Sequence, residues 1–286
     1  MGVDLLAGAG EGVLDGAALG RAPRIAVFDS GLGGLTVHAE IARQLPGASF
    51  VYLGDTAVFP YGRLSDEDLV RRVEAVIGQL IAAHAPDLVV IACNTASTLA
   101  LPVLRARFAL PFVGTVPAVK SAARLSQSRR FSILATPGTV ARDYTRELIA
   151  AHAADCGVTL VGSRSLASLA EAALRGEAAD DAAISAEIAP AFVEDAAGRT
   201  DAVVLACTHY PLLLERLEAL APWPVSWIDP APAIARRVAA LVGSVAQAGF
   251  EPEGARALFT RAEPLPAALV QMLGQRGFVE IGREAC

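Results

Sequence analysis

The chain has 286 residues, which is enough for two domains of ordinary size, each with its own core. Apolar residues make up 53% of it and charged residues 19%, a balance that excludes an intrinsically disordered protein. The formal net charge is −6 and there is no basic cluster, so no nucleic-acid partner is expected. No stretch reaches the roughly 20 apolar residues of a membrane span, so no membrane association is expected either.

Residues 1–22 are rich in Gly and Ala, show no sustained period, and are expected to form a flexible N-terminal extension. They carry no positive charge before Arg21, unlike a signal peptide. The four cysteines of the chain are too few for a disulfide scaffold of this length. We therefore expect a cytoplasmic protein with reduced thiols.

Strands and helices alternate from residue 24 onward. Predicted strands cover 24–28, 50–53, 88–92 and 111–114, with helices between them, one of which begins with a capping box at Ser65 and Asp68. The pattern then restarts, with strands expected at 131–135, 158–161, 202–206 and 225–228 and helices near 140–153, 166–175, 181–197 and from Ala231. The tail is expected to hold a helix at 265–274 and a short strand near Phe278.

This alternation is typical of the α/β class, in which helices flank parallel sheets. Because the pattern occurs twice, we predict two pseudo-symmetric domains with the active site in the cleft between them. The first domain is expected to be discontinuous, formed by 23–117 plus 229–286, and the second to be formed by 118–228.

One half-site occurs in both parts of the chain. Asp87 precedes five apolar residues that lead to Cys93, and Asp201 precedes five that lead to Cys207. Such a run is typical of a buried parallel strand, whose carboxyl end is where open α/β sheets bind ligands. Each thiol also precedes a predicted helix, whose dipole lowers the pKa of a thiol at its N-terminus. These two cysteines are the candidates for chemistry, whereas Cys156 and Cys286 have no such context.

Three kinds of chemistry use a pair of thiols. A redox couple is disfavoured because the cysteines belong to different predicted domains and form no Cys-x-x-Cys motif. A zinc site built on both thiols and His209 would need a further ligand, and the other histidines fall on predicted helices, so no metal is expected. Racemisation fits the repeat best, because it removes a proton from one face of a stereocentre and returns one to the other.

No cofactor is expected for this chemistry. Pyridoxal phosphate is anchored on a lysine, and Lys120 is the only lysine here, with no evident phosphate cradle nearby. The glycines between Gly31 and Gly34 follow a strand, but they lack the full G-x-G-x-x-G spacing of a dinucleotide site.

Polar residues beside the two thiols are candidates for the remaining roles. Asp29, at the end of the first strand, is expected to orient or deprotonate Cys93, and His209 to do the same for Cys207. The alternatives are an N-cap for Asp29 and a structural role for His209. The residues expected to hold the substrate's carboxylate and ammonium groups are Asn94, Thr95 and Thr208, with Ser30, Tyr61 and Gly62 completing the cradle.

Five segments carry a resemblance to a known family. They are F-D-S-G-L-G-G-L-T at 28–36, G-D-T-A-V-F-P-Y-G at 54–62, A-C-N-T-A-S-T at 92–98, A-T-P-G-T at 135–139 and A-C-T-H-Y-P at 206–211. In them the chain resembles the glutamate racemases of the cofactor-independent aspartate/glutamate racemase superfamily. The P-Y-G segment is similar to the loop that distinguishes glutamate racemases from their aspartate and hydantoin relatives.

The resemblance implies an isomerase in which Cys93 acts on D-glutamate and Cys207 on L-glutamate, supplying D-glutamate for peptidoglycan synthesis. It implies that Asp29, His209 and the cradle residues contact the substrate, and it adds Thr139 and Glu171 near the site. It leaves open a homodimer and regulation by a cell-wall precursor. The alternatives are a racemase of the same fold for aspartate or another small amino acid, a non-catalytic amino-acid-binding protein and a thiol hydrolase.

Overall fold

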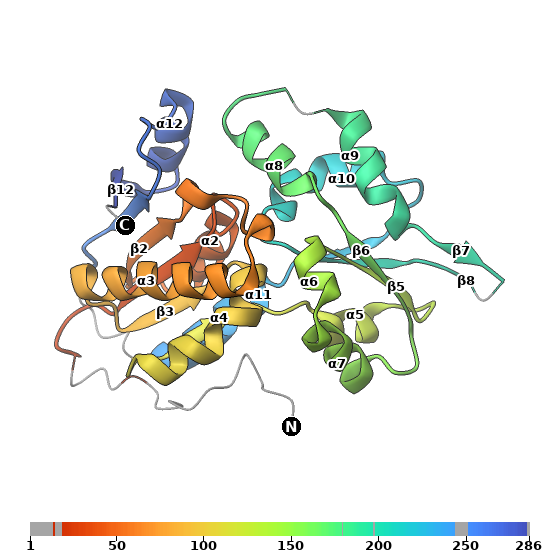
Figure 1. Ribbon diagram of the computed structural model, residues 1–286, viewed down its shortest axis with the longest axis horizontal. Coiled ribbons are helices and arrows are strands. Elements are labelled where there is room, and N and C mark those ends of the chain that lie inside the picture. The colour runs from red at the N-terminus through yellow and green to blue at the C-terminus, as the bar shows by residue number, and fades with distance from the viewer. Residues whose placement is uncertain (1–13, 15–18, 179, 197, 244–250, 285–286) are drawn as a thin grey trace. The chain divides into compact units, whose positions relative to one another are not determined.

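The computed structural model describes residues 14, 19–178, 180–196, 198–243 and 251–284. Within these residues the chain forms two compact units, each with its own parallel sheet (Figure 1). Unit 1 is Val116–Pro230, and unit 2 combines the residues up to Thr115 with those from Ala231 onward. None of the described helices is both long enough and apolar enough to cross a membrane.

Unit 2 is built on a six-stranded sheet in the order β12-β11-β2-β1-β3-β4, with all neighbouring strands parallel. The strands are β1 (Arg24–Asp29), β2 (Ser49–Gly54), β3 (Leu88–Ile91), β4 (Phe112–Gly114), β11 (Ala255–Phe259) and β12 (Phe278–Arg283). The helices are α2 (Leu35–Gln44), α3 (Asp66–His84), α4 (Asn94–Arg107), α11 (Ala231–Val242) and α12 (Ala267–Gln275), with 3-10 turns at Thr56–Val58 and Tyr61–Arg63.

The helices cover both faces of this sheet, as the α/β class predicts. Crossovers between parallel strands are right-handed, so α2, which leads from β1 to β2, lies on the opposite face from α3 and α4. α3 packs on α4, and α2 packs on α11 (Figure 1). Ser65 caps α3 by accepting a hydrogen bond from the Asp68 amide at 3.1 Å, which confirms the predicted helix start.

The tail adds two strands to the sheet, of which the sequence analysis missed β11. This strand has five residues, among them two alanines and an arginine, so its intrinsic strand signal is weak. It forms because it pairs along β2 from Ala255 to Phe259. Phe278 of β12 then stacks on the ring of His38 with 4.7 Å between the ring centroids. Burial lowers the pKa of His38 to about 4, so this histidine is neutral in the core.

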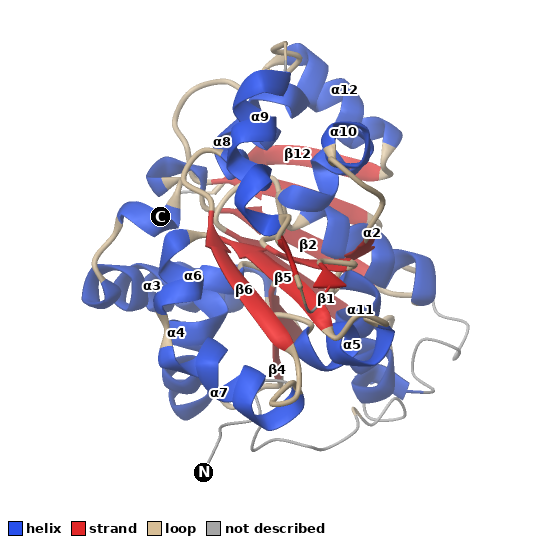
Figure 2. Cartoon of the chain, turned by 90° about the vertical axis from the view of Figure 1, so that its right-hand side faces the viewer, coloured by secondary structure: helices blue, strands red, loops and turns tan. Residues whose placement is uncertain are grey.

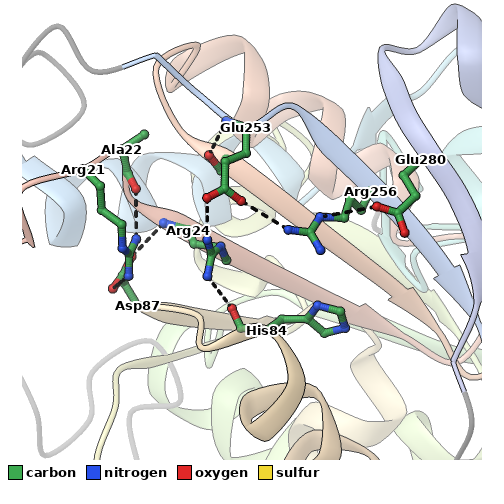
Figure 3. Close-up of polar contacts among 9 residues, drawn as sticks. Arg21, Ala22, Arg24, His84, Asp87, Glu253, Arg256 and Glu280 are labelled. Carbon is green, nitrogen blue, oxygen red and sulfur yellow. Dashed lines mark hydrogen bonds and ion pairs between the residues drawn. The ribbon is translucent and has the colours of Figure 1, made fainter.

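A polar network lies at the amino-terminal edge of the same sheet (Figure 3). Arg21 bonds both carboxylate oxygens of Asp87, at 2.8 and 2.9 Å, and the Arg24 amide bonds the same carboxylate at 2.7 Å. The Arg24 guanidinium bonds Glu253, just before β11, at 2.7 Å. The network therefore joins the start of β1 to the segment that enters the tail.

The predicted flexible extension is described only in part. Residues 1–13 and 15–18 lie outside the described residues. In the part that is described, the Leu14 amide donates to the Leu241 carbonyl at 2.8 Å, and Arg21 forms the ion pair with Asp87. These residues are thus bonded to the body of unit 2.

Unit 1 has a four-stranded parallel sheet in the order β10-β9-β5-β6, and Figure 2 shows β5 and β6 side by side. The strands are β5 (Arg130–Ala135), β6 (Gly157–Gly162), β9 (Ala202–Ala206) and β10 (Ser226–Ile228), and a separate antiparallel pair is formed by β7 (Glu194–Asp195) and β8 (Gly198–Arg199). The helices are α5 (Val119–Leu125), α6 (Pro137–Ala141), α7 (Asp143–His152), α8 (Leu166–Leu174), α9 (Asp181–Ile188) and α10 (Leu214–Leu220), with 3-10 turns at Ala189–Ala191 and Tyr210–Leu213.

Two predicted helices of unit 1 are wrong in extent. The helix expected at 181–197 ends at Ile188 and continues only as the 3-10 turn Ala189–Ala191, in which Pro190 has no amide hydrogen to extend the α-helical bonding. The helix expected at 140–153 is two helices, α6 and α7, separated at Arg142, whose backbone is extended with φ −78° and ψ 142°.

Candidate active site

The carboxyl edge of the unit 2 sheet gathers several of the predicted site residues. Asp29, the last residue of β1, pairs with Gly54 of β2, and Phe28 pairs with Ile91 of β3. The segments just beyond these strand ends therefore lie side by side. They carry Ser30, Asp55 and Cys93.

Cys93 is the N-cap of α4, a helix of 14 residues, and its carbonyl accepts a hydrogen bond from the Ser97 amide at 2.8 Å. The thiol is 5% exposed and lies at the positive end of the helix dipole, as predicted. The next residue, Asn94, is also buried, and its Oδ1 accepts a hydrogen bond from the Thr115 hydroxyl at 3.5 Å.

The Asn94 side chain has an unused donor. Its Nδ2 atom is buried and has no hydrogen-bond partner among the described residues. A buried donor without a partner costs about 1–3 kcal/mol, so it is retained where a ligand supplies the acceptor. A carboxylate oxygen is such an acceptor. The neighbouring Thr95, in the first turn of α4, is buried as well.

Asp29 is completely buried, and its Oδ2 accepts a hydrogen bond from the Gly31 amide at 3.0 Å. Helix α2 has Gly34 at its N-cap position and no side-chain cap, so Asp29 is not the N-cap of this helix. A Cβ atom on Gly34 would lie 2.7 Å from the Cβ atom of Asp29. Glycine at this position therefore allows α2 to begin directly against the candidate carboxylate.

Tyr61 lies in the 3-10 turn after β2, and its hydroxyl donates to Asp55 Oδ2 at 2.6 Å. Burial and then the Asp55 carboxylate raise the pKa of Tyr61 well above its ordinary range, so the phenol is neutral. The next residue, Gly62, is exposed, and a Cβ atom built on it would meet nothing within 4 Å.

The sequence analysis missed Asp55 and, among its partners, Arg72 and Thr260. Besides the Tyr61 hydroxyl, the carboxylate accepts hydrogen bonds from two nitrogens of Arg72 and from the Thr260 hydroxyl. Asp55 lies within the G-D-T-A-V-F-P-Y-G segment, which could have marked it. Thr260 could not be found in this way, because it follows β11, the strand that was not predicted.

The carboxyl edge of the unit 1 sheet carries the second thiol. Along β9 the side chains alternate between two cores, and Val203, Leu205 and Cys207 share the core that α8 and α9 cover. Cys207 is 7% exposed, and its Sγ lies 3.8 Å from Nδ1 of His209. The Thr208 hydroxyl lies 3.4 Å from the same nitrogen.

A chain of polar contacts continues from His209. Its Nε2 lies 3.0 Å from Oε1 of Glu171 on α8, and the other carboxylate oxygen accepts a hydrogen bond from Arg175 at 2.9 Å. His209 and Glu171 are both buried. Of the predicted site residues in unit 1, the structure thus brings Cys207, Thr208, His209 and Glu171 together.

The expectation that both thiols lie at the start of a helix is wrong for Cys207. A 3-10 turn, Tyr210–Leu213, follows it, and α10 begins only at Leu214. Pro211 in this turn lacks an amide hydrogen and favours a tight local geometry. The residues beside Cys207 are instead His209 and the buried phenol of Tyr210, whose pKa is raised by burial and then by the Cys207 thiol.

Thr139 lies at the same edge of the unit 1 sheet as Cys207, because Ala135 pairs with Ala206. It is buried in α6, and its hydroxyl lies 3.1 Å from that of Thr136, the N-cap residue of α6. Lys120 is exposed on α5. No three His, Cys, Asp or Glu side chains converge as metal ligands within the part of the chain that the structure describes.

Comparison with known proteins identifies relatives over most of the chain. The family model described as Asp/Glu/Hydantoin racemase matches residues 34–238. A glutamate racemase of Brucella canis is 55% identical over 219 residues, which are 76% of this chain and 79% of the relative. A glutamate racemase of Brucella anthropi is 54% identical over 219 residues, which are again 76% of this chain and 79% of the relative.

Solved structures of racemases share the fold. A glutamate racemase of Escherichia coli, solved with L-glutamate and the activator UDP-MurNAc-ala, is 39% identical with a TM-score of 0.83, over 92% of this chain and 98% of that one. A glutamate racemase of Thermus thermophilus, solved with beta-chloro-D-alanine, is 29% identical with a TM-score of 0.72. The match covers 93% of this chain and 97% of that one. The chain therefore belongs to the Asp/Glu/hydantoin racemase family, in which it groups with the glutamate racemases, and it is an isomerase.

Proposed function

We propose that this enzyme interconverts L-glutamate and D-glutamate by proton transfer through Cys93 and Cys207, without a cofactor. The observation that carries the proposal is the pair of buried thiols, each at the carboxyl end of a parallel strand and each beside buried polar side chains. We propose glutamate as the substrate because the relatives are named glutamate racemases.

In the proposed reaction one cysteine begins as a thiolate and the other as a thiol. The thiolate takes the α-proton from one face of the substrate, and the electron pair of the broken C–H bond remains on the α-carbon, delocalised into the carboxylate. The second thiol then donates its proton to the opposite face, forming the new C–H bond and becoming a thiolate. Cys93 acts first on D-glutamate and Cys207 first on L-glutamate, so the two cysteines exchange roles between directions.

The intermediate places extra negative charge on the substrate's carboxylate, and donors aimed at that group stabilise it. Asn94 Nδ2 is suited to this task, because this side-chain donor has no hydrogen-bond partner among the described residues. The backbone amides at the start of α4 are suited to it as well, because they lie at the positive end of the helix dipole. On the other side, His209 is suited to accept the Cys207 proton through Nδ1 while Glu171 holds Nε2.

The proposal is tested with dialysed, EDTA-treated protein incubated with L-glutamate in deuterium oxide. We expect D-glutamate by chiral chromatography, with deuterium at the α-carbon by mass spectrometry, because the incoming proton comes from a solvent-exchanged thiol. L- and D-aspartate, tested in parallel, should react far more slowly. Absence of both D-glutamate and α-exchange would contradict the proposal, and faster turnover of aspartate would favour an aspartate racemase of the same fold.

Lys120→Ala tests the cofactor-free mechanism separately. Because Lys120 is an exposed residue of α5, we expect its replacement to change kcat/KM by no more than about twofold. The measurement is the racemisation rate with and without added pyridoxal phosphate. A complete loss of turnover in this variant, with the fold intact by circular dichroism, would reopen the question of a Schiff-base cofactor.

The proposed product also suggests where the enzyme is used. The family resemblance supports a cytoplasmic reaction whose D-glutamate enters peptidoglycan. The chain should then restore growth, without added D-glutamate, to a bacterial strain that depends on it. A strain that still needs the supplement, despite making active enzyme, would contradict this use.

A further inference from the structure

The Asp55 carboxylate is fully buried, and its hydrogen-bonding capacity is filled. Oδ2 accepts the Tyr61 hydroxyl at 2.6 Å and Arg72 Nε at 2.9 Å. Oδ1 accepts Arg72 Nη2 and the Thr260 hydroxyl, both at 2.6 Å. A carboxylate has about four acceptor sites, so these four donors occupy all of them. Tyr61 is therefore held as a donor to Asp55, and its phenolic oxygen can act only as an acceptor toward a further partner.

Asp55, Tyr61, Arg72 and Thr260 form the Asp55 cluster. Thr260 is the member that lies far from the others in sequence. Its hydroxyl donates to Asp55 and accepts the Ala57 amide at 3.1 Å, so both ends of the hydroxyl group are used. Its own amide donates to the Gly54 carbonyl at 3.2 Å. The Arg261 amide donates to the Thr56 hydroxyl at 3.2 Å. Every residue from 54 to 57 is thus bonded to the tail.

The sheet register explains why the tail reaches this loop. Phe259 of β11 pairs with Gly54 of β2, so the next residue of the tail lies beside Asp55. A Cβ atom on Gly54 would lie 2.9 Å from the Phe259 ring, which shows how closely the two strands approach. At the opposite edge of the sheet, Glu253 bonds Arg24 (Figure 3). β11 is therefore fixed at both of its ends.

We propose that Thr260, supplied by the C-terminal tail, is a positioning residue that sets the Tyr61–Gly62 segment for substrate binding. The inference rests on the proposed function and on the expectation, from the family resemblance, that Tyr61 and Gly62 contact the substrate. Thr260 acts through Asp55 and Ala57: it fixes the carboxylate that orients the Tyr61 hydroxyl, and it anchors the backbone four residues before Tyr61. Arg72 forms a two-point ion pair with Asp55, which holds the carboxylate in place.

Thr260→Val tests the proposal, because valine keeps the shape of threonine and removes the hydroxyl. We expect KM for both glutamate enantiomers to rise about tenfold with a smaller change in kcat, since the loss falls on a group that binds the substrate. Thr260→Ser keeps the hydroxyl and should restore KM to near the wild-type value. Initial rates in both directions, fitted separately for kcat and KM, give the result.

Leu269→Ala is the matched control for loss of stability. Leu269 is a buried residue of α12 in the same tail, and it has no part in the Asp55 cluster. We expect this variant to lower Tm while leaving KM near the wild-type value. The proposal is overturned if Thr260→Val lowers Tm in the same way without raising KM, or if Thr260→Ser fails to restore KM.

Amide hydrogen exchange gives a readout that needs no substrate. In Thr260→Val the Ala57 amide loses its acceptor, so its exchange should become faster, and the amides of 58, 59 and 61–64 should follow. Unchanged exchange in this segment would overturn the positioning role. A wild-type protein that fails to racemise glutamate would overturn the proposed function, whereas faster exchange with an unchanged KM would overturn only the role of Thr260.

Discussion

Cys93→Ser and Cys207→Ser are each expected to lower kcat/KM for glutamate racemisation by about 10²- to 10⁴-fold, the usual contribution of one acid or base group. Serine keeps the size of the side chain, but its hydroxyl is a far weaker acid than a thiol. In the proposed mechanism, removal of either thiol leaves one of the two proton transfers without its acid or base. The measurement is the initial rate of racemisation from each enantiomer.

The two enantiomers have the same free energy, so the equilibrium constant of the reaction is one. The ratio kcat/KM must therefore fall by the same factor in both directions, even though each cysteine is proposed to act first on a different enantiomer. Only the separate values of kcat and KM can differ between directions. An unequal fall would reveal an error in the assay rather than a property of the enzyme.

Cys156→Ser is the matched control for the two substitutions. Cys156 is partly exposed and lies just before the amino end of β6, whereas the candidate site residues lie at the carboxyl edge of the sheet. Its replacement should therefore leave the rate unchanged. Calorimetry should show that both active-site variants still bind glutamate. Full racemisation by either of them would refute the two-base mechanism.

The fold was largely predictable because its signals are local. Buried apolar runs mark β1, β2, β3, β5 and β9, and the capping box at Ser65 marks the start of α3. β11 carries no comparable signal, because its strand conformation depends on β2, which is about 200 residues away in sequence. The helix expected at 181–197 was overextended because Pro190, which has no amide hydrogen for an α-helical bond, was not weighed.

The positions of the candidate site residues were predictable where those residues end or follow strands that the sequence itself reveals. Cys93 and Cys207 belong to this group, and so do Asp29 and His209. The differences between the two halves were not predictable, since the 3-10 turn after Cys207 depends on how Tyr210 and Pro211 pack. Long-range partners such as Thr260 are absent from any local pattern, because a side-chain hydrogen bond leaves no trace in sequence spacing.

Glu171→Gln is expected to lower kcat/KM about 100-fold, because it changes which nitrogen of His209 carries the proton. In the Ser-His-Asp triad the carboxylate likewise fixes the tautomer of the histidine, and replacing it with an amide gives the wrong tautomer. The Glu171 carboxylate only accepts hydrogen bonds, so His209 Nε2, 3.0 Å away, carries the proton. In the neutral imidazole Nδ1 is then unprotonated and can accept the proton of Cys207. The amide of glutamine can donate to Nε2, which favours the tautomer with the proton on Nδ1.

The same substitution also weakens the contact between residue 171 and Arg175, so loss of that contact must be separated from the tautomer effect. Arg175→Met removes the ion pair and leaves Glu171 beside His209, and we expect it to cost much less activity. The decisive measurement is a double-mutant cycle with His209→Asn. If Glu171 acts through His209, adding Glu171→Gln to His209→Asn should cause little further loss. Independent, additive losses would instead mean that Glu171 stabilises the fold around Cys207 by a route that does not involve the histidine.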